Sequence, residues 1–220
     1  MSCELPVDVL SLILITDRNL CKRPLLETVA LALKGGVKAV QLREKGLATR
    51  ELYTLANELR KMTSDFGAGL FINDRVDIAL AVDADGVHLG WQSLPVPVVQ
   101  GLLGVKKLIG VSTHNRQEAL QALNDGADYI MFGPVFYTPS KAGILDPVGV
   151  EEVRRLKDEI HAPIVALGGI NEGNVEAVLD SGVEGIAVIS SILSADDAEK
   201  ASWGLFDKIM KHRLRNTGVV

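Results

Sequence analysis

The sequence contains few cysteines and few aromatic residues. Its two cysteines, Cys3 and Cys21, are too few for a disulfide framework, and their spacing fits no metal site. We therefore expect a reducing, cytoplasmic location. Aromatic residues make up only 5% of the chain, which argues against the stacking platforms that bind single-stranded nucleic acid.

The sequence also lacks long apolar runs and an excess of basic residues. No run reaches the roughly 18 residues needed to cross a bilayer, and residues 1–8 lack the basic start of a signal peptide. The net charge is −5 and the basic residues are spread along the chain, so no surface for nucleic acid is indicated. With 220 residues, 47% of them hydrophobic, the chain is expected to be globular, without nucleic-acid or membrane partners. A homo-oligomer remains open.

Short apolar runs alternate with helical patterns along the whole chain. Most runs are continuous rather than alternating, which is typical of parallel strands buried on both faces. The runs lie at 10–15, 39–42, 69–72, 86–89, 107–111, 129–132, 163–167 and 185–189. Helical patterns lie between them at 50–65, 115–124, 148–159, 171–180 and 196–214. In the last of these, Trp203, Phe206 and Met210 recur at helical spacing and predict its packed face.

An internal repeat along the chain favours a closed barrel over an open sheet. Similar joints at 35–40, 81–87, 125–130 and 181–186 precede every second apolar run, so the repeated element is about two strand–helix units. Eight such units predict a single (β/α)₈ TIM barrel over 1–220, with an N-terminal extension at 1–9 and a C-terminal tail at 215–220. An open, doubly wound α/β sheet is the alternative.

The segment after the second run is rich in cations. On a strand, Gln41, Arg43 and Lys45 point to one side, and an amide with two cations suits a strongly anionic ligand. The alternative is a solvated salt-bridge cluster with Glu44. His88, between two apolar residues of the fourth run, is predicted to be a buried, hydrogen-bonded histidine.

Polar residues and glycines follow the other runs, where a barrel places its active site. Asp74 offers a hard oxygen ligand for Mg²⁺, and Asn73 can bond a heterocycle, although either could instead cap a helix. Gly168 and Gly169 after the seventh run, and Ile189 and Ser190 after the eighth, are typical of a phosphate site. The alternative is that the glycines only make tight turns.

The segment 133–147 is long for a barrel connection and predicts a lid or binding loop. Thr138, Ser140 and Lys141 supply two hydroxyls and a cation there. A mobile surface insertion is the alternative. Taken alone, these residues predict an enzyme that acts on a phosphorylated small molecule with Mg²⁺.

These segments together resemble the motifs of the thiamine phosphate synthase family in order and spacing. The segments are 41–45, 72–77, 86–90, 109–114, 132–141 and 166–171. The resemblance implies a transferase that joins the pyrimidine diphosphate of thiamine biosynthesis to a thiazole phosphate and releases pyrophosphate. The implied substitution passes through a carbocation-like centre and requires no side-chain nucleophile.

The resemblance also implies roles for individual residues. The pyrimidine diphosphate would be held by Gln41, Arg43, Lys45, Asn73, Ser112 and Lys141. The thiazole phosphate would be held by Thr138, Ser140, Gly168, Gly169, Ile189 and Ser190. Arg43, Lys45, Ser112 and Lys141 would take part in catalysis, and Asp74 would bind Mg²⁺.

One position departs from the family pattern. Ser93 stands where a second Mg²⁺-binding aspartate is expected, and a neutral hydroxyl is a poorer ligand. A related thiazole tautomerase, or a diverged paralogue that only binds the thiazole phosphate, is therefore the alternative function. Pro134 favours the synthase, because the tautomerase in its best-known form carries a histidine there.

Overall fold

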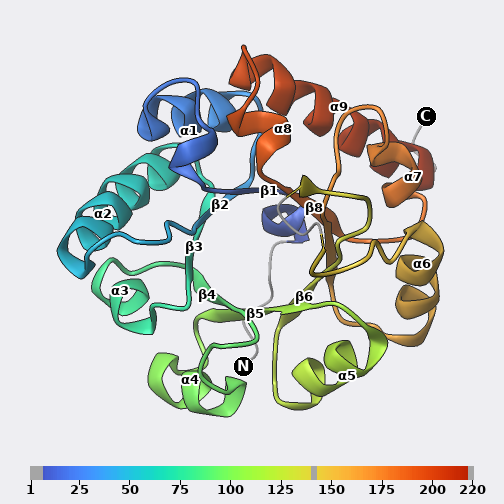
Figure 1. The fold of residues 1–220 in the computed structure, drawn as a ribbon, viewed down its shortest axis with the longest axis horizontal. Helices are drawn as coiled ribbons and strands as arrows, with labels where there is room; N and C mark the ends of the chain where they lie inside the picture. The colour runs from blue at the N-terminus through green and yellow to red at the C-terminus, as the bar shows by residue number, and fades with distance from the viewer. Residues whose placement is uncertain (1–6, 140–142, 218–220) are drawn as a thin grey trace.

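The computed structural model describes residues 7–139 and 143–217, and its strands close into a barrel (Figure 1). Each strand pairs in parallel with the next, and β8 pairs with β1. The strands are β1 (Leu12–Ile15), β2 (Ala39–Leu42), β3 (Gly69–Asn73), β4 (Gly86–Leu89), β5 (Leu108–Thr113), β6 (Tyr129–Phe132), β7 (Ile164–Leu167) and β8 (Gly185–Val188). The closed barrel confirms the predicted (β/α)₈ fold, and the open sheet is wrong.

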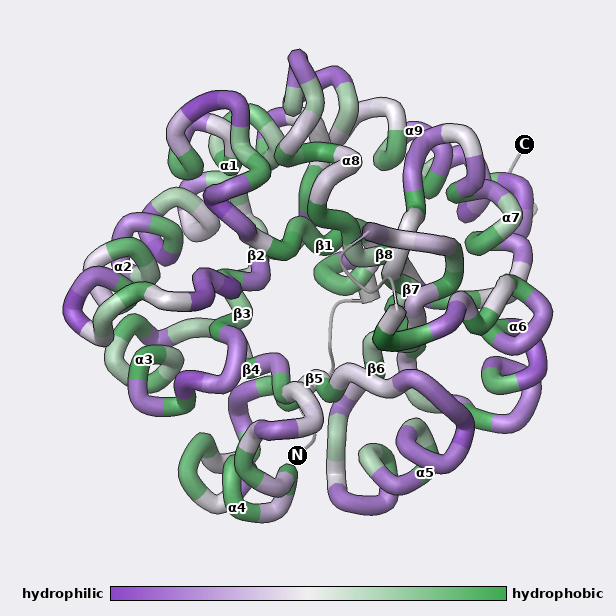
Figure 2. Tube along the Cα trace, viewed as in Figure 1, coloured by the Kyte–Doolittle hydropathy of each residue, from purple (hydrophilic) through white to green (hydrophobic). Residues whose placement is uncertain are grey.

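Helices form a ring around the strands (Figure 1). They are α1 (Leu25–Lys34), α2 (Thr49–Asp65), α3 (Val76–Ala81), α4 (Val96–Leu103), α5 (Arg116–Asn124), α6 (Val150–Glu159), α7 (Val175–Leu179), α8 (Ser190–Leu193) and α9 (Ala198–Thr217), with the 3₁₀ helices η1 (Val7–Leu10) and η2 (Arg18–Leu20). In Figure 2, α4 is hydrophobic over most of its length, whereas the neighbouring α5 is mainly hydrophilic. Among the described residues, no helix is both long and apolar enough to span a bilayer.

Some predicted boundaries differ from the observed ones. The run at 10–15 becomes a strand only from Leu12, because the preceding residues form η1. The helix expected from 171 begins at Val175. Helix α9 continues through Thr217, so the tail expected at 215–220 begins inside it.

The core has two layers. The larger layer lies between the strands and the helices, and the smaller layer fills the barrel. Phe71 and Tyr129 are the bulkiest side chains of the inner layer, and their rings meet edge-to-face at 5.7 Å. Leu10 of η1 packs against this layer, so the first described segment helps to close the barrel end opposite the strand carboxyl ends.

The internal repeat has a structural counterpart at the amino ends of the strands. Just before β4, β6 and β8, a carboxylate accepts a hydrogen bond from a backbone N–H of the preceding strand. The pairs are Asp85 with Leu70 at 2.7 Å, Asp128 with Ile109 at 2.7 Å and Glu184 with Ile164 at 2.8 Å. The fourth joint carries Lys38 instead, whose ammonium lies 3.6 Å from Asp8. The repeated carboxylate therefore accepts hydrogen bonds from backbone N–H groups that the neighbouring strands leave unpaired.

The packed face predicted for α9 is confirmed at Phe206, which packs against the core, and is wrong at Trp203. Trp203 is exposed, and the face toward the barrel carries the buried Ser202, Leu205 and Ile209. The reason is the close approach of α1: a Cβ placed on Gly35 would lie 2.6 Å from the Cβ of Ser202. Such a contact admits a serine but not an indole.

Candidate active site

Side chains from the carboxyl ends of β2, β3 and β4 form one hydrogen-bonded chain at the barrel mouth. Gln41 Nε2 donates to Asn73 Oδ1 at 3.0 Å, and Asn73 Nδ2 donates to Asp74 Oδ2 at 2.8 Å. The Ser93 hydroxyl donates to Asp74 Oδ1 and accepts from the Gly90 N–H at 2.6 Å. Each of these predicted residues thus fixes the orientation of the next.

The buried end of this chain is Gln41. Its Oε1 atom has no hydrogen-bond partner among the described residues, although the side chain is almost fully buried. A buried acceptor without a partner costs about 1–3 kcal/mol. The arrangement is therefore suited to a ligand that brings its own N–H donor.

The exposed end of the chain is Asp74, which adopts an uncommon backbone conformation. Its φ is 61°, and its N–H donates to the His88 carbonyl at 3.0 Å. This left-handed conformation is sparsely populated outside glycine, and aspartate is one of the residues that tolerate it. The helix that follows has Arg75 at its N-cap, without a side-chain cap. Neither Asn73 nor Asp74 therefore acts as the helix cap that the sequence left open.

Asp74 and Ser93 provide only hard oxygen atoms toward a metal. Among the described residues, no three His, Cys, Asp or Glu side chains come together as a metal site. Mg²⁺ often takes one or two carboxylates and completes its shell with water and substrate phosphates. The residues present therefore fit a Mg²⁺ ion that is shared with a phosphorylated ligand.

Arg43 and Lys45 lie beyond the end of β2, and Glu44 turns away from them. The Glu44 carboxylate is buried, accepts the Arg18 N–H at 3.1 Å and lies 3.6 Å from Arg18 Nε. Arg43 is half-buried, and its N–H donates to the hydroxyl of Thr16 at 2.9 Å. Within the described part of the chain, neither the Arg43 guanidinium nor the exposed Lys45 ammonium has an ion pair. The salt-bridge cluster that the sequence left open is not formed.

His88 holds Ser112 from inside the barrel. His88 Nε2 lies 2.8 Å from the Ser112 hydroxyl, and Nδ1 lies 3.4 Å from the Tyr129 hydroxyl. Burial, together with the nearby charge of Arg43, lowers the pKa of His88 to about 3. Burial raises the pKa of Tyr129. The predicted buried, hydrogen-bonded histidine is confirmed, and its ring is neutral at ordinary pH.

This pairing couples the proton positions of His88, Tyr129 and Ser112. A neutral imidazole donates from one nitrogen only. If Tyr129 donates to Nδ1, then Nε2–H donates to Ser112, and the serine hydroxyl is left as a donor toward the mouth. Gly110, the strand partner of both His88 and Tyr129, makes the contact sterically possible. That His88 contacts Ser112 could not be predicted from the sequence, because the contact depends on strand register.

The loops after β6 and β7 lie against each other. Gly168 and Gly169 have φ values of 100° and 66°, and a Cβ on Gly168 would lie 2.5 Å from Pro134. The Phe136 N–H donates to the Gly168 carbonyl at 3.0 Å. The glycines therefore serve close loop packing. A turn over 171–174 separates them from α7, which begins at Val175.

Ile189 and Ser190 lie at the start of α8, and the next residue, Ser191, donates its hydroxyl to the Ile170 carbonyl. Thr138 is half-buried in the loop after β6. The remaining two predicted residues of that loop, Ser140 and Lys141, lie outside the described residues.

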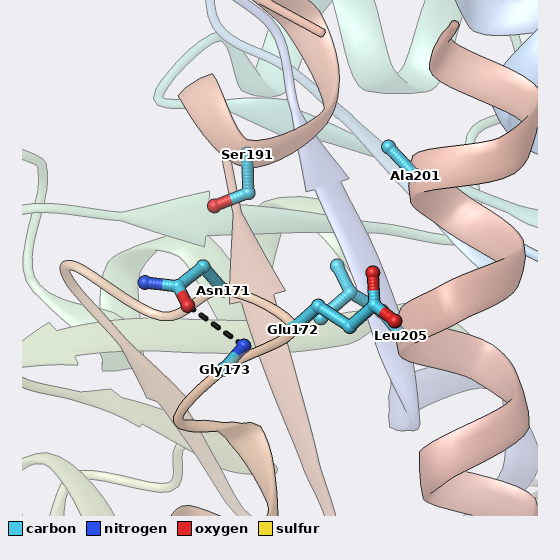
Figure 3. A pocket seen from close by; sticks show the side chains of 6 residues that line it. All are labelled: Asn171, Glu172, Gly173, Ser191, Ala201 and Leu205. Atoms are coloured by element: carbon cyan, nitrogen blue, oxygen red, sulfur yellow. Dashed lines mark hydrogen bonds between the residues drawn. The ribbon is translucent and has the colours of Figure 1, made fainter.

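A cavity of about 240 Å³ lies beside these loops (Figure 3). Its lining residues are Asn171, Glu172, Gly173, Ser191, Ala201 and Leu205. The Gly173 N–H donates to Asn171 Oδ1 at 2.9 Å, which fixes the turn that forms one wall (Figure 3). The opposite wall belongs to α9, so this cavity is separate from the chain that joins Gln41 to Ser93.

Comparison with known proteins identifies the family. The family described as thiamine monophosphate synthase matches residues 12–192, from β1 into α8. The chain belongs to this family. Membership makes the chain a transferase of thiamine biosynthesis.

Individual relatives of the family agree. The thiamine-phosphate synthase of Syntrophomonas wolfei is 50% identical over 190 residues, covering 86% of this chain and 91% of the relative. That of Clostridium novyi is 46% identical over 192 residues, covering 87% of this chain and 94% of the relative. The solved structure of thiamine phosphate pyrophosphorylase from Pyrococcus furiosus is 41% identical, with a TM-score of 0.87 over 94% of this chain and 98% of that one. The tautomerase alternative is not favoured by these relatives.

Proposed function

We propose that this chain joins a pyrimidine diphosphate to a thiazole phosphate, giving thiamine phosphate and pyrophosphate. The C–O bond between the pyrimidine methylene and the diphosphate breaks, and its electron pair leaves with pyrophosphate. A C–N bond then forms between the methylene and the thiazole nitrogen. The observation that carries the proposal is the hydrogen-bonded chain from Gln41 to Ser93 beside the unpaired cations.

The buried end of that chain is the proposed pyrimidine subsite. The unpartnered Gln41 Oε1 accepts a hydrogen bond from the exocyclic amino group of the heterocycle. Asn73 holds the Gln41 amide so that its oxygen faces the ligand. An amino group that donates to a fixed acceptor also supports the positive charge that develops on the methylene.

The diphosphate is proposed to lie against Arg43, Lys45 and Ser112. The Arg43 guanidinium offers two parallel N–H donors to phosphate oxygens, and the Lys45 ammonium adds a point charge. Ser112 is proposed to donate its hydroxyl to the diphosphate while it accepts Nε2–H from the His88 ring, which lies 2.8 Å away. These groups stabilise the leaving group as its negative charge grows. Lys141 remains a prediction for the same role.

Asp74 is proposed to hold Mg²⁺ together with the diphosphate, and Ser93 orients the Asp74 carboxylate. When bound, Mg²⁺ neutralises charge on the leaving group. Because Ser93 supplies no negative charge, we expect the ion to bind tightly only when the diphosphate is present.

The thiazole phosphate is proposed to bind on the opposite side of the mouth. Gly168, Gly169, Ile189 and Ser190 provide backbone and hydroxyl donors for its phosphate, and Thr138 adds a further hydroxyl. Ser140 remains a prediction for this subsite. The loop after β6 would exclude water from the carbocation-like centre. Alignment of two substrates then provides much of the catalysis.

We also propose the cytoplasm as the location, because the chain contains only two cysteines.

The direct experiment supplies purified protein with both substrates and Mg²⁺ and measures thiamine phosphate and pyrophosphate. We expect equal amounts of both products, and their loss on addition of EDTA. Asp74→Ala should lose most activity, whereas Asp77→Ala, a matched carboxylate paired with Arg75, should keep it. Isomerisation of the thiazole without any condensation would instead identify a tautomerase.

A binding measurement tests the metal assignment independently of turnover. Isothermal titration with Mg²⁺ alone should show weak binding to the native chain and tighter binding to Ser93→Asp, which adds a second carboxylate beside Asp74. With inorganic pyrophosphate present, both proteins should bind Mg²⁺. An unchanged titration for Ser93→Asp would remove Ser93 from the metal site.

A further inference from the structure

The segment 90–105 is unusual in its lack of charge. It contains no acidic, basic or histidine residue, in a chain that is 23% charged. The segment comprises the loop after β4, helix α4 and the turn that follows. Figure 2 shows α4 as one of the most hydrophobic parts of the outer ring.

Helix α4 is apolar on two opposite sides. Its inner side, with Val96, Val99 and Leu103, is buried in the core. Its outer side, together with the loop before it and the turn after it, carries exposed apolar side chains that we call the α4 stripe. The α4 stripe consists of Trp91 (83% exposed), Leu94 (53%), Val98 (49%), Leu102 (54%) and Val105 (76%). Val98 and Leu102 lie four residues apart on α4 and therefore form a ridge, and Leu94 precedes them just before the helix begins.

Such a surface is more apolar than a solvent-facing helix requires. A helix that is hydrophobic all round is normally buried. The α4 stripe exposes about 500–600 Å² of side-chain surface, at the upper end of what a monomer leaves uncovered. A stable interface buries about 800 Å² on each partner. The α4 stripe would supply the apolar centre of such an interface, and Gln92 and Gln100 would lie at its polar edge.

The lack of charge selects the occupant. A basic or acidic peptide would find no opposite charge on this face. A helix that lies on a membrane carries basic residues beside its apolar face, and the segment has none. A second copy of this chain avoids both problems, because a neutral face meets a neutral face despite the net charge of −5 on each copy. Two-fold symmetry makes one ridge complementary to itself.

The geometry of α4 also permits a close approach. Gly101 lies beside the ridge, and a Cβ added there would meet nothing within 4 Å. The gap next to Leu102 gives a groove for the ridge of a second helix. Val98 lies at the middle of the stripe, so it would lie near the two-fold axis. We propose that the α4 stripe is an isologous interface at which two copies of this chain associate.

Sedimentation velocity over a range of concentrations tests this proposal. The native chain should sediment as a particle of twice its 23.6 kDa mass at micromolar concentrations. Leu102→Glu places an unpaired charge at the centre of the interface and should weaken association by about 100-fold. The matched control is Leu214→Glu on α9, a leucine of the same 54% exposure, which should leave the dimer unchanged. Melting curves would check that both variants fold.

A cross-link locates the interface. In a background that lacks Cys3 and Cys21, oxidised Val98→Cys should form a disulfide-linked dimer, because the two copies of position 98 face each other. The proposal would be overturned if the native chain were monomeric both at high concentration and after 100-fold dilution. It would also be overturned if Leu102→Glu remained a dimer and position 98 formed no cross-link. Flotation of a monomeric chain with neutral phosphatidylcholine vesicles would assign the stripe to a membrane instead.

Discussion

The buried His88 predicts a specific dependence of stability on pH. The pKa of His88 falls from an ordinary value of 6.5 to about 3 in the folded chain. Below pH 6.5 the unfolded chain therefore binds a proton that the folded chain does not. Stability from this residue is fully present above pH 6.5 and is lost as the pH falls toward 3.

The magnitude follows from the size of the shift. Each pH unit in this window costs about 1.4 kcal/mol, so the whole window corresponds to about 5 kcal/mol. Between pH 7 and pH 5, His88 alone should remove about 2 kcal/mol from the free energy of unfolding. Other titrating groups contribute as well, but they contribute equally to a variant that lacks only this imidazole.

Denaturant unfolding at pH 7 and pH 5 measures the effect. Between the two pH values, the free energy of unfolding of the native chain should fall by about 2 kcal/mol more than that of His88→Gln. Glutamine is chosen because its amide reaches toward Ser112. His161→Asn is the control, since His161 is exposed, and it should retain the native pH dependence. Identical pH dependence in the native chain and His88→Gln would refute the neutral, buried imidazole.

Three further predictions concern other parts of the barrel. Gly110→Ala should destabilise the chain by about 2–3 kcal/mol in thermal unfolding, because the new methyl would lie 2.1 Å from the Tyr129 ring; an unchanged melting temperature would contradict this packing. Arg43→Gln should raise the KM for the pyrimidine diphosphate by about 10-fold or more without changing the melting temperature; an unchanged KM in steady-state kinetics would remove Arg43 from the site. Burial raises the pKa of Asp128, so its carboxylate costs stability as the pH rises above the ordinary value of 3.8 through the raised one. Asp128→Asn keeps an acceptor for Ile109 and should be at least as stable as the native chain at pH 7, which urea unfolding can check; a clear loss there would show that the negative charge itself is needed.

The barrel could be predicted because its strands are buried on both faces. Continuous runs of mainly apolar residues at 39–42, 86–89 and 129–132 match the observed strands, all of whose residues are buried. The helix after β7 was misplaced because side chains compete with the helical backbone. Asn171 bonds the Gly173 N–H, and Asn174 bonds the Asn171 N–H at 2.9 Å. These local bonds hold a turn, so the helix starts at Val175.

The site was predicted as a set of residues but not as a network. Gln41, Asn73 and Asp74 lie together because carboxyl ends of adjacent parallel strands meet at one rim. The bond from Ser93 to Asp74 was missed, because the sequence suggests only a lost carboxylate there. The contact between His88 and Ser112 was missed for a different reason: it depends on which inward residues share a layer of the barrel.

The internal repeat explains why one end of the barrel is structural and the other chemical. At the amino ends, three of the four equivalent positions carry a carboxylate that accepts a strand N–H. Three residues further on, the equivalent buried positions are Gln41, His88, Met131 and Ala187. The repeat therefore preserves the backbone bonding but changes the chemistry from amide and imidazole to thioether and methyl. Because the polar pair belongs to β2 and β4, we propose that the pyrimidine diphosphate lies on that side of the mouth and the thiazole phosphate on the side of β6 and β8.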